Sequence, residues 1–213
     1  MKIEYLGHSC FCLTTENGIK ILTDPYTQVG YSLPKGLTVD IVTVSHGHFD
    51  HNYLEGVKAK KVVKDTLLYK ENGVRIEGIS TFHDEKQGAL RGKNTIYKIY
   101  ADGLTVCHLG DLGEKYSETL KNLIGKMDIC LIPVGGTYTI NAKEAMEYVE
   151  KTNPHVVIPM HYRPKDGALD ITDAQPFLRL WNKEVQNCLY GEIVLKKDDL
   201  QDRETKLVYM ERK

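Results

Sequence analysis

The seven residues 45–51, Ser-His-Gly-His-Phe-Asp-His, place three imidazoles and one carboxylate in one short segment. They directly follow an apolar run that is typical of a β-strand. Packing of a protein core does not require three histidines so close together, whereas a divalent metal ion is commonly bound by neutral imidazole and carboxylate groups together. In an extended loop His46 and His48 can reach one ion, while Asp50 and His51 turn toward a second. The segment therefore predicts a metal site.

Metal-ligating residue types also follow three other apolar runs, at the point where each run ends. These are His83 after residues 74–82, Asp111 after 104–110 and His161 after 155–160. If those strand ends share one edge of the sheets, the side chains converge on residues 45–51. Two divalent ions about 3.5–4 Å apart need several imidazoles and one carboxylate that bridges them, and they lower the pKa of bound water to about 7.

Four further polar residues leave alternatives open. His8 follows the first strand and either acts as a proton shuttle or substrate contact, or bonds to its own turn. Asp24 either orients a ligand histidine or begins the turn that Pro25 continues. We expect a supporting or structural role for His108 and a structural one for His155.

Short runs rich in Val, Ile and Tyr predict the strands that must position these residues. They lie near residues 2–6, 10–15, 19–23, 40–44, 74–81, 95–100, 104–108, 128–132, 155–159 and 205–210. Helices are predicted over 114–125, with Gly125 as the stop, over 141–151, where Asn141 and Glu144 form a capping box, and near 173–181. Strands dominate the first half and alternate with helices in the second, which indicates one layered α/β domain over residues 1–213.

Composition restricts the classes of partner. The 213 residues are 41% hydrophobic and 27% charged, and 28 Lys+Arg oppose 29 Asp+Glu for a formal net charge of −1. Without a basic excess, nucleic acid is not expected as an obligatory partner. Five scattered cysteines are typical of buried small hydrophobes rather than of a thiolate site. No apolar stretch long enough for a leader or a membrane span is evident, so a reducing cytoplasm is expected.

The histidine segment resembles the H-x-H-x-D-H signature of the metallo-β-lactamase superfamily of metal-dependent hydrolases. Other segments similar to the family follow in the family's order, at residues 7–11, 22–25, 82–83, 108–111, 132–139 and 158–162. The chain looks most like the small stand-alone branch of lactonase-like, zinc-dependent hydrolases.

This resemblance implies a four-layer αββα sandwich with a dinuclear site at one edge. It implies two divalent metal ions, zinc first, with manganese, iron or nickel as alternatives. Carried onto this chain, it gives His46, His48 and His83 to the first ion. It gives Asp50, His51 and His161 to the second, and Asp111 bridges both.

Departures from particular branches narrow the expected chemistry. Members that degrade β-lactams have cysteine where this chain has Asp111, and the flavodiiron branch has Glu where His48 stands. The long arm of the tRNA-processing branch is not evident, and there is no room for the extra domain of members that cleave RNA or DNA. We therefore expect a small hydrolase.

The leading hypothesis is attack by a metal-bridged hydroxide on a small ester, lactone or phosphodiester, with Asp50 and His8 as catalytic residues. Gly135, Gly136, Thr137 and Tyr138 follow another strand and are candidate substrate contacts, or a plain loop. The aromatic loop 26–36 is expected to cover the pocket. The alternatives are a nuclease acting on RNA or DNA, and a non-catalytic metal-binding domain. Arg91 and Arg163 do not decide between phosphate and carbonyl substrates, and no residue indicates the oligomeric state.

Overall fold

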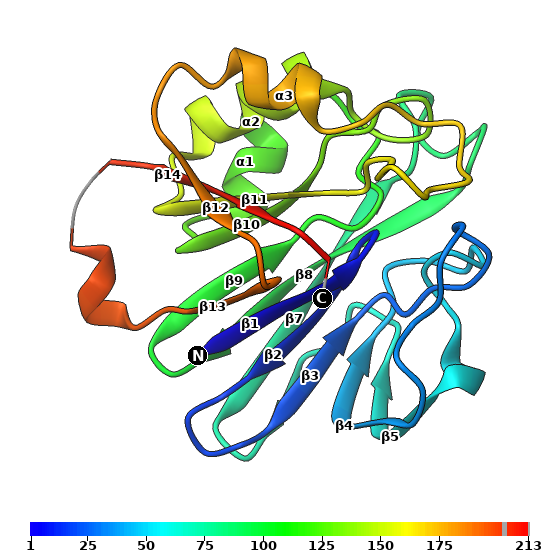
Figure 1. The fold of residues 1–213 in the computed structure, drawn as a ribbon, viewed down its shortest axis with the longest axis vertical. Helices are drawn as coiled ribbons and strands as arrows, with labels where there is room; N and C mark the ends of the chain where they lie inside the picture. Colours follow the sequence, from blue (N-terminus) through cyan, green and yellow to red (C-terminus); the bar gives the residue numbers. More distant parts are fainter. Residues whose placement is uncertain (202–203, 213) are drawn as a thin grey trace.

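Two β-sheets pack face to face in the computed structural model, which describes residues 1–201 and 204–212 (Figure 1). The first sheet has the order β13-β1-β2-β3-β4-β5, with bounds Glu192–Val194, Lys2–Gly7, Cys10–Thr14, Lys20–Thr23, Leu37–Thr43 and Val57–Val63. The second has the order β12-β14-β11-β10-β9-β8-β7-β6, with bounds Val185–Cys188, Lys206–Met210, Val156–Met160, Ile129–Pro133, Leu104–His108, Lys93–Ala101, Val74–Phe82 and Tyr69–Glu71.

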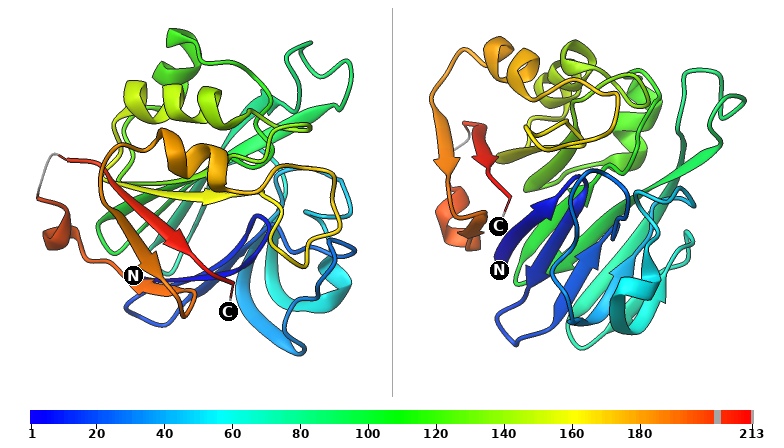
Figure 2. Two further views of the ribbon diagram at one scale, coloured as in Figure 1. Left: turned by 45° about the horizontal axis from the view of Figure 1, so that its top comes forward. Right: turned by 45° about the vertical axis from the view of Figure 1, so that its right-hand side comes forward.

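The α-helices of the described residues cover the outer face of the second sheet (Figure 2). They are α1 (Glu118–Ile124), α2 (Ala142–Thr152) and α3 (Gln175–Leu180), and two short 3₁₀ turns lie at Leu54–Gly56 and Lys197–Leu200. Every residue of the parallel strands β10 and β11 is buried, because one face of the sheet meets the other sheet and the opposite face meets the helices. The two packed sheets with helices on one outer face confirm the predicted α/β sandwich, although regular helices do not form a fourth layer on the first sheet in the described residues.

One apolar core fills the space between the sheets. Phe11 and Leu13 from the first sheet share a buried cluster with Ile96, Val106 and Leu131 from the second. Full burial of one such side chain stabilises the fold by about 1.5–3 kcal/mol relative to exposure. The sheets are thereby fixed against each other, and so are the loops that leave their ends.

The helix boundaries follow local signals in the sequence. The Asn141 side chain accepts hydrogen bonds from Lys143 N and Glu144 N, and Glu144 accepts one from Asn141 N at 2.9 Å, so the predicted capping box is confirmed. Helix α1 ends at Gly125 as predicted, with φ at 63°. It begins later than expected, because Ser117 accepts the hydrogen bond from Leu120 N and serves as the N-cap.

The outer face of the first sheet is covered by irregular chain. Tyr26, Val29 and Leu33 pack on Leu22 and Val42 in a second buried cluster. The expectation that loop 26–36 covers the pocket is therefore wrong, because its apolar side chains are used on this face. Prolines 25 and 34 and glycines 30 and 36 break any helical run between β3 and β4, so this side has no regular helical layer in residues 24–36.

The strands that sequence patterns missed are short or lie at sheet edges. β5 exposes Lys58, Lys60 and Lys61 at the edge of the first sheet, where charged side chains disfavour pairing with other chains. β6, β12 and β13 have only three or four residues each and few apolar side chains. Within residues 1–201 and 204–212, no helix is long and apolar enough to cross a membrane.

Candidate metal centre

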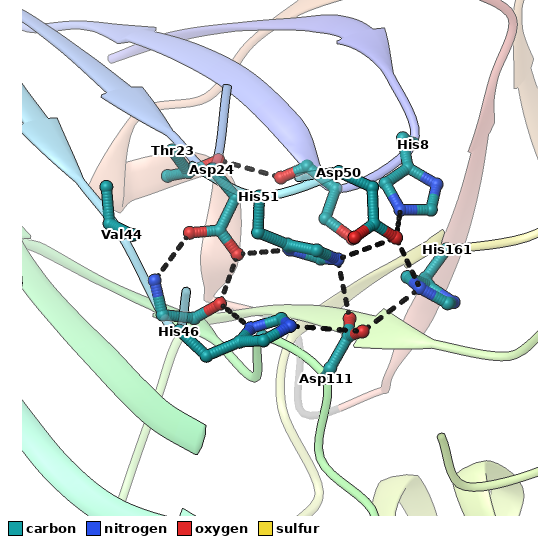
Figure 3. A network of polar contacts seen from close by, with 12 residues as sticks. His8, Thr23, Asp24, Val44, His46, Asp50, His51, Asp111 and His161 are labelled. Carbon is teal, nitrogen blue, oxygen red and sulfur yellow. Dashed lines mark hydrogen bonds and ion pairs between the residues drawn. The ribbon is translucent and has the colours of Figure 1, made fainter. Parts of the chain in front are cut away.

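Loops that leave six strands meet at one end of the sandwich. They carry His8 after β1, Asp24 after β3, residues 45–51 after β4, His83 after β7, Asp111 after β9 and His161 after β11. Figure 3 shows the side chains of several of them pointing toward one another. The convergence expected from the strand ends is therefore observed.

Asp111 lies at the centre of this cluster, with 1% of its surface exposed. Nε2 of His51 is 3.0 Å from Oδ1, while Nε2 of His83 and Nε2 of His161 are 3.1 and 3.2 Å from Oδ2. Nε2 of His46 is 3.7 Å from Oδ2. One carboxylate thus faces four imidazoles, which is the arrangement that a bridging ligand requires.

The donor atoms divide into groups small enough to bind single ions. In each group all donor atoms lie within 4.8 Å of one another, and the groups are His46, His48 and His83; His8, Asp50, His51 and His161; and His46, His51 and Asp111. The first two groups contain the two ligand sets implied by the resemblance, and His8 joins the second. The third links them through Asp111.

Several of these buried atoms have no hydrogen-bond partner. They include Nε2 of His51, Nε2 of His161 and Oδ1 of Asp111. Buried polar atoms are nearly always satisfied in folded proteins, and such exceptions need an explanation. Neutral imidazole and carboxylate lone pairs that converge in this way fit divalent cations such as zinc, manganese or iron.

Backbone strain marks the same site. His8, Asp24 and His161 have φ of 54°, 38° and 50°, in the left-handed region that residues other than glycine rarely adopt. His161 N donates to His8 O at 2.9 Å, so the two strained segments brace each other. Gly110 has φ of 54°, and a Cβ there would lie 2.3 Å from Asn94 Oδ1. The turn before Asp111 therefore requires glycine.

Asp24 and Ser45 set the orientation of two histidines. Asp24 Oδ1 accepts from Ser45 N at 2.8 Å, and Oδ2 lies 2.8 Å from His51 Nδ1 and accepts from Ser45 Oγ. The hydroxyl proton of Ser45 goes to Asp24, so Ser45 Oγ accepts from His46 Nδ1 at 2.9 Å. Both rings consequently carry their proton on Nδ1 and aim Nε2 at the site. Asp24 thus orients His51, in agreement with the first of the two roles considered for it, and the ligand role of His51 stays a prediction.

Asn94 is a supporting residue that sequence reasoning missed. Its Oδ1 accepts from Asp111 N at 2.9 Å, and its Nδ2 donates to Thr81 Oγ1 at 2.9 Å and Leu109 O at 3.0 Å. The residue is fully buried. A single asparagine at the start of a strand carries no local signal, because its partners come from three distant positions.

The remaining histidines divide as follows. His8 Nε2 lies 3.1 Å from Asp50 Oδ2, which places His8 at the site. His108 donates through Nε2 to Ser9 O at 2.8 Å and accepts at Nδ1 from Gly110 N at 3.1 Å, a structural role as expected. His155 opens β11 at the opposite end from His161 and lies near Asp128.

Electrostatics favour the ligand forms of His46, His8 and Asp111, whereas two carboxylates favour the protonated form of His51. Burial, aided by the charge of neighbouring histidines, lowers the pKa of His46 to about 3 and that of His8 to about 4, so both are neutral at pH 7. Burial alone would raise the pKa of Asp111, but His161 and His51 hold it well below its ordinary value. Burial opposes the charged form of His51, yet the Asp111 and Asp24 carboxylates raise its pKa well above normal.

A pocket of about 260 Å³ opens onto the cluster. Its floor includes His48, Asp50, His83 and Asp111, and its walls are formed by Phe49, Arg91, Tyr138 and Leu169. Sequence reasoning did not single out Phe49 or Leu169, because Phe49 is the variable position between His48 and Asp50 and Leu169 lies in no recognisable motif.

The four candidate substrate contacts lie in different surroundings. Tyr138 is in the pocket wall. Gly135 is buried and donates to His161 O at 3.0 Å, and a Cβ there would lie 2.2 Å from that oxygen, so Gly135 supports the backbone of His161. Gly136 is also buried and Thr137 is exposed. Contact of Gly135, Gly136 and Thr137 with a substrate stays a prediction.

Comparison with known proteins places these features in a family. The β-lactamase superfamily domain model matches residues 2–161. A UPF0173 metal-dependent hydrolase of Methanoregula boonei is 33% identical over 190 residues, which cover 76% of this chain and 82% of the relative. A similarly named hydrolase of Thermococcus onnurineus is 30% identical over 191 residues, covering 76% and 84%.

Solved structures agree with these relatives. A Thermotoga maritima protein, described as belonging to the Zn-dependent hydrolases of the metallo-β-lactamase superfamily, matches with a TM-score of 0.80 and 37% identity. The match covers 98% of this chain and 97% of that one. A metallo hydrolase of Ignicoccus hospitalis matches with a TM-score of 0.67 at 22% identity and covers 99% and 95%, a likeness of fold.

Proposed function

This chain belongs to the metallo-β-lactamase superfamily and is a metal-dependent hydrolase, and we propose that it uses two divalent ions to hydrolyse a small ester, lactone or phosphodiester. The observation that carries the proposal is the buried Asp111 carboxylate, which faces four imidazoles at the floor of a pocket. One apolar core joins the two sheets, which supports a single hydrolase domain over residues 1–213.

The proposed ligands follow the two groups of donor atoms. His46, His48 and His83 hold one ion, Asp50, His51 and His161 hold the other, and Asp111 is shared. Zinc is the first choice, and manganese, iron or nickel fit the same donors, because imidazole and carboxylate suit all of these ions. When bound, two such ions supply a hydroxide nucleophile at neutral pH and polarise the bond that it attacks.

His8 and Asp50 form the proposed catalytic pair. With its pKa lowered to about 4 by burial, His8 is neutral, and its Nε2 donates to Asp50 Oδ2. Burial would raise the pKa of Asp50, but the His8 hydrogen bond and the nearby His51 lower it, so the carboxylate stays ionised as a ligand requires. The side chain of Asp50 reaches the pocket, where its lone pairs can hold a proton released during hydrolysis.

The pocket favours a small molecule. A volume of about 260 Å³ lies just below the roughly 300–1,000 Å³ that is typical of ligand pockets. The pocket lining has apolar walls and a single arginine, Arg91, whereas a groove that binds a nucleic-acid backbone is lined by several cationic side chains. A small ester-type substrate fits both properties.

The test is hydrolysis of a lactone, an aryl ester, a thioester and an aryl phosphodiester by the zinc- or manganese-loaded protein. Asp111→Ala is the active-site variant, and Asp128→Asn is the control, because Asp128 is a buried carboxylate near His155 at the opposite end of β11. We expect turnover of one class in the wild type and in the control, with loss in Asp111→Ala. Stoichiometric metal binding without turnover of any member would instead support the non-catalytic alternative.

A further inference from the structure

The pocket combines apolar walls with one cation. Phe49 is 48% exposed at the mouth, and Tyr138 and Leu169 complete the apolar lining. Arg91 is the one Lys or Arg among the lining residues that the structure describes. Within that described part of the chain, no carboxylate lies within 4.0 Å of its guanidinium.

Arg91 is held in place by a structured loop. Asp84 is buried, and its carboxylate accepts four backbone hydrogen bonds, from Lys86 N at 2.8 Å, Gly88 N at 3.0 Å, Leu90 N at 3.1 Å and Arg91 N at 2.7 Å. Since His83 N also donates to Gly92 O at 3.0 Å, the loop is tied at both ends. This fixes the backbone of Arg91 at the rim of the site.

The side chain of Arg91 is also positioned. Its guanidinium carbon lies 5.1 Å from the centre of the Tyr138 ring, within the range of a cation–π contact. Tyr138 itself is presented by a strained turn, in which Tyr138 N donates to Gly136 O at 2.6 Å and the β-branched Thr137 has φ of 58°. Such strain persists where a site requires the geometry that it produces.

We propose that Arg91 recognises an anionic group on the substrate. The substrate is then a small ester-type molecule with a hydrophobic body on Phe49 and Leu169 and a carboxylate or phosphate that faces Arg91. This inference rests on the proposed hydrolase function and names the class of substrate for the same site. A guanidinium without a carboxylate partner, held on an aromatic ring beside an apolar wall, is suited to bidentate binding of such an anion.

A structural role for Arg91 predicts a different outcome. If the guanidinium only packs the loop against Tyr138, its removal affects all substrates alike. If it binds an anion, its removal affects only substrates that carry one. Charge-assisted hydrogen bonds at a partly exposed site lead us to expect a change of about tenfold or more in KM for the anionic substrate, with kcat little changed.

The experiment uses three esters that share one scissile bond: phenyl acetate, 3-carboxyphenyl acetate and 3-phosphonophenyl acetate. Wild type, Arg91→Met, Arg91→Lys and Lys86→Met are compared as metal-loaded proteins. Arg91→Met keeps an apolar side chain over Tyr138 without the charge. Arg91→Lys keeps the charge but loses the planar guanidinium that donates two parallel hydrogen bonds. Lys86→Met removes the same charge from an exposed position on the same loop and is the matched control.

We expect the wild type and Lys86→Met to have a lower KM for one anionic ester than for phenyl acetate, and Arg91→Met to lose that preference. Arg91→Lys recovers part of it. The preferred ester distinguishes carboxylate from phosphate. Equal effects of Arg91→Met on all three esters, or no preference in the wild type, would overturn the inference.

A binding measurement separates this inference from the proposed hydrolase activity. If none of the esters is hydrolysed, anion recognition is tested by calorimetric titration. Wild type and Arg91→Met are titrated with benzoate, phenylphosphonate and benzamide. Weaker binding of one anion to Arg91→Met, with benzamide unaffected, upholds anion recognition although ester hydrolysis fails. Identical binding to both proteins overturns it.

Discussion

Replacing Asp24 by asparagine tests how the centre is oriented. Oδ1 of Asp24 accepts from Ser45 N, and Oδ2 faces both Ser45 Oγ and His51 Nδ1. Asparagine has one acceptor oxygen and one amino group. If the oxygen stays on Ser45 N, the amino group faces His51 Nδ1, which must then accept a hydrogen bond. The ring proton moves to Nε2, the atom that lies 3.0 Å from Asp111 Oδ1, and His51 loses the lone pair that a metal needs.

The opposite amide orientation is also unfavourable. In this orientation the amino group faces Ser45 N, so two hydrogen-bond donors meet in a fully buried position. This lowers the free energy of unfolding by about 1–3 kcal/mol. Loss of a supporting hydrogen bond of this kind typically reduces metal affinity 10- to 100-fold, or about 1.4–2.7 kcal/mol. We therefore expect Asp24→Asn to bind zinc at least tenfold more weakly than the wild type.

Competition with a chromophoric zinc chelator at pH 7.5 measures this change. Asp128→Asn is the matched control, because the Asp128 carboxylate is also buried and accepts from Thr105 N at 2.8 Å, but has no contact with the centre. Zinc affinity of Asp24→Asn within about twofold of the wild type would refute the assigned orientation of His51. An equal loss in Asp128→Asn would trace the effect to general destabilisation.

Two stability predictions concern residues that support the site. Asn94→Ala leaves buried Asp111 N and Leu109 O without their partner, so the unfolding free energy falls by about 2–3 kcal/mol and Tm by roughly 5–10 °C in calorimetry; an unchanged Tm would contradict this. Burial opposes ionisation of Asp84, but its four backbone donors outweigh it and lower its pKa. Its stabilisation is thus present above the unfolded pKa of about 3.9 and lost as the pH falls through the folded pKa. Asp84→Asn should lower Tm at pH 7, and thermal scans should show the gap to wild type closing below about pH 4; a constant gap would exclude this role.

Much of the candidate metal centre could be predicted because short segments of the sequence mark both the strands and the polar residues that follow them. The histidines and carboxylates come directly after apolar runs, and strand ends that share an edge bring such residues together. His46, His51 and Asp111 therefore lie together as expected. The α/β fold could be predicted for the same reason, since the buried runs of β10 and β11 alternate with an amphipathic helix whose cap is visible in the sequence. The ligand roles themselves stay predictions.

What sequence reasoning missed depends on tertiary contacts. Asn94 reaches Asp111 N across 17 positions, and no local pattern marks either partner. Loop 26–36 contains aromatic residues, which suggested a pocket cover, but the first sheet has an apolar outer face that this loop must bury. Tyr138 was a candidate contact, but Phe49 and Leu169 were missed and Arg91 was not placed in the pocket wall, because these three residues come from three separate loops.

The structure separates the elements that hold the metal centre from those that shape the pocket. Most of the proposed ligands lie directly after strands whose positions are fixed by the core, and His108 and Asn94 bind the adjoining backbone. The pocket walls instead come from loops, where substitutions change contacts without moving a strand. Substitution of Arg91 or Phe49 can therefore alter which substrate is bound while leaving the ligand cluster in place. Substitution of Asp24 acts on that cluster whatever the substrate, so comparison of the two kinds of variant separates substrate recognition from metal binding.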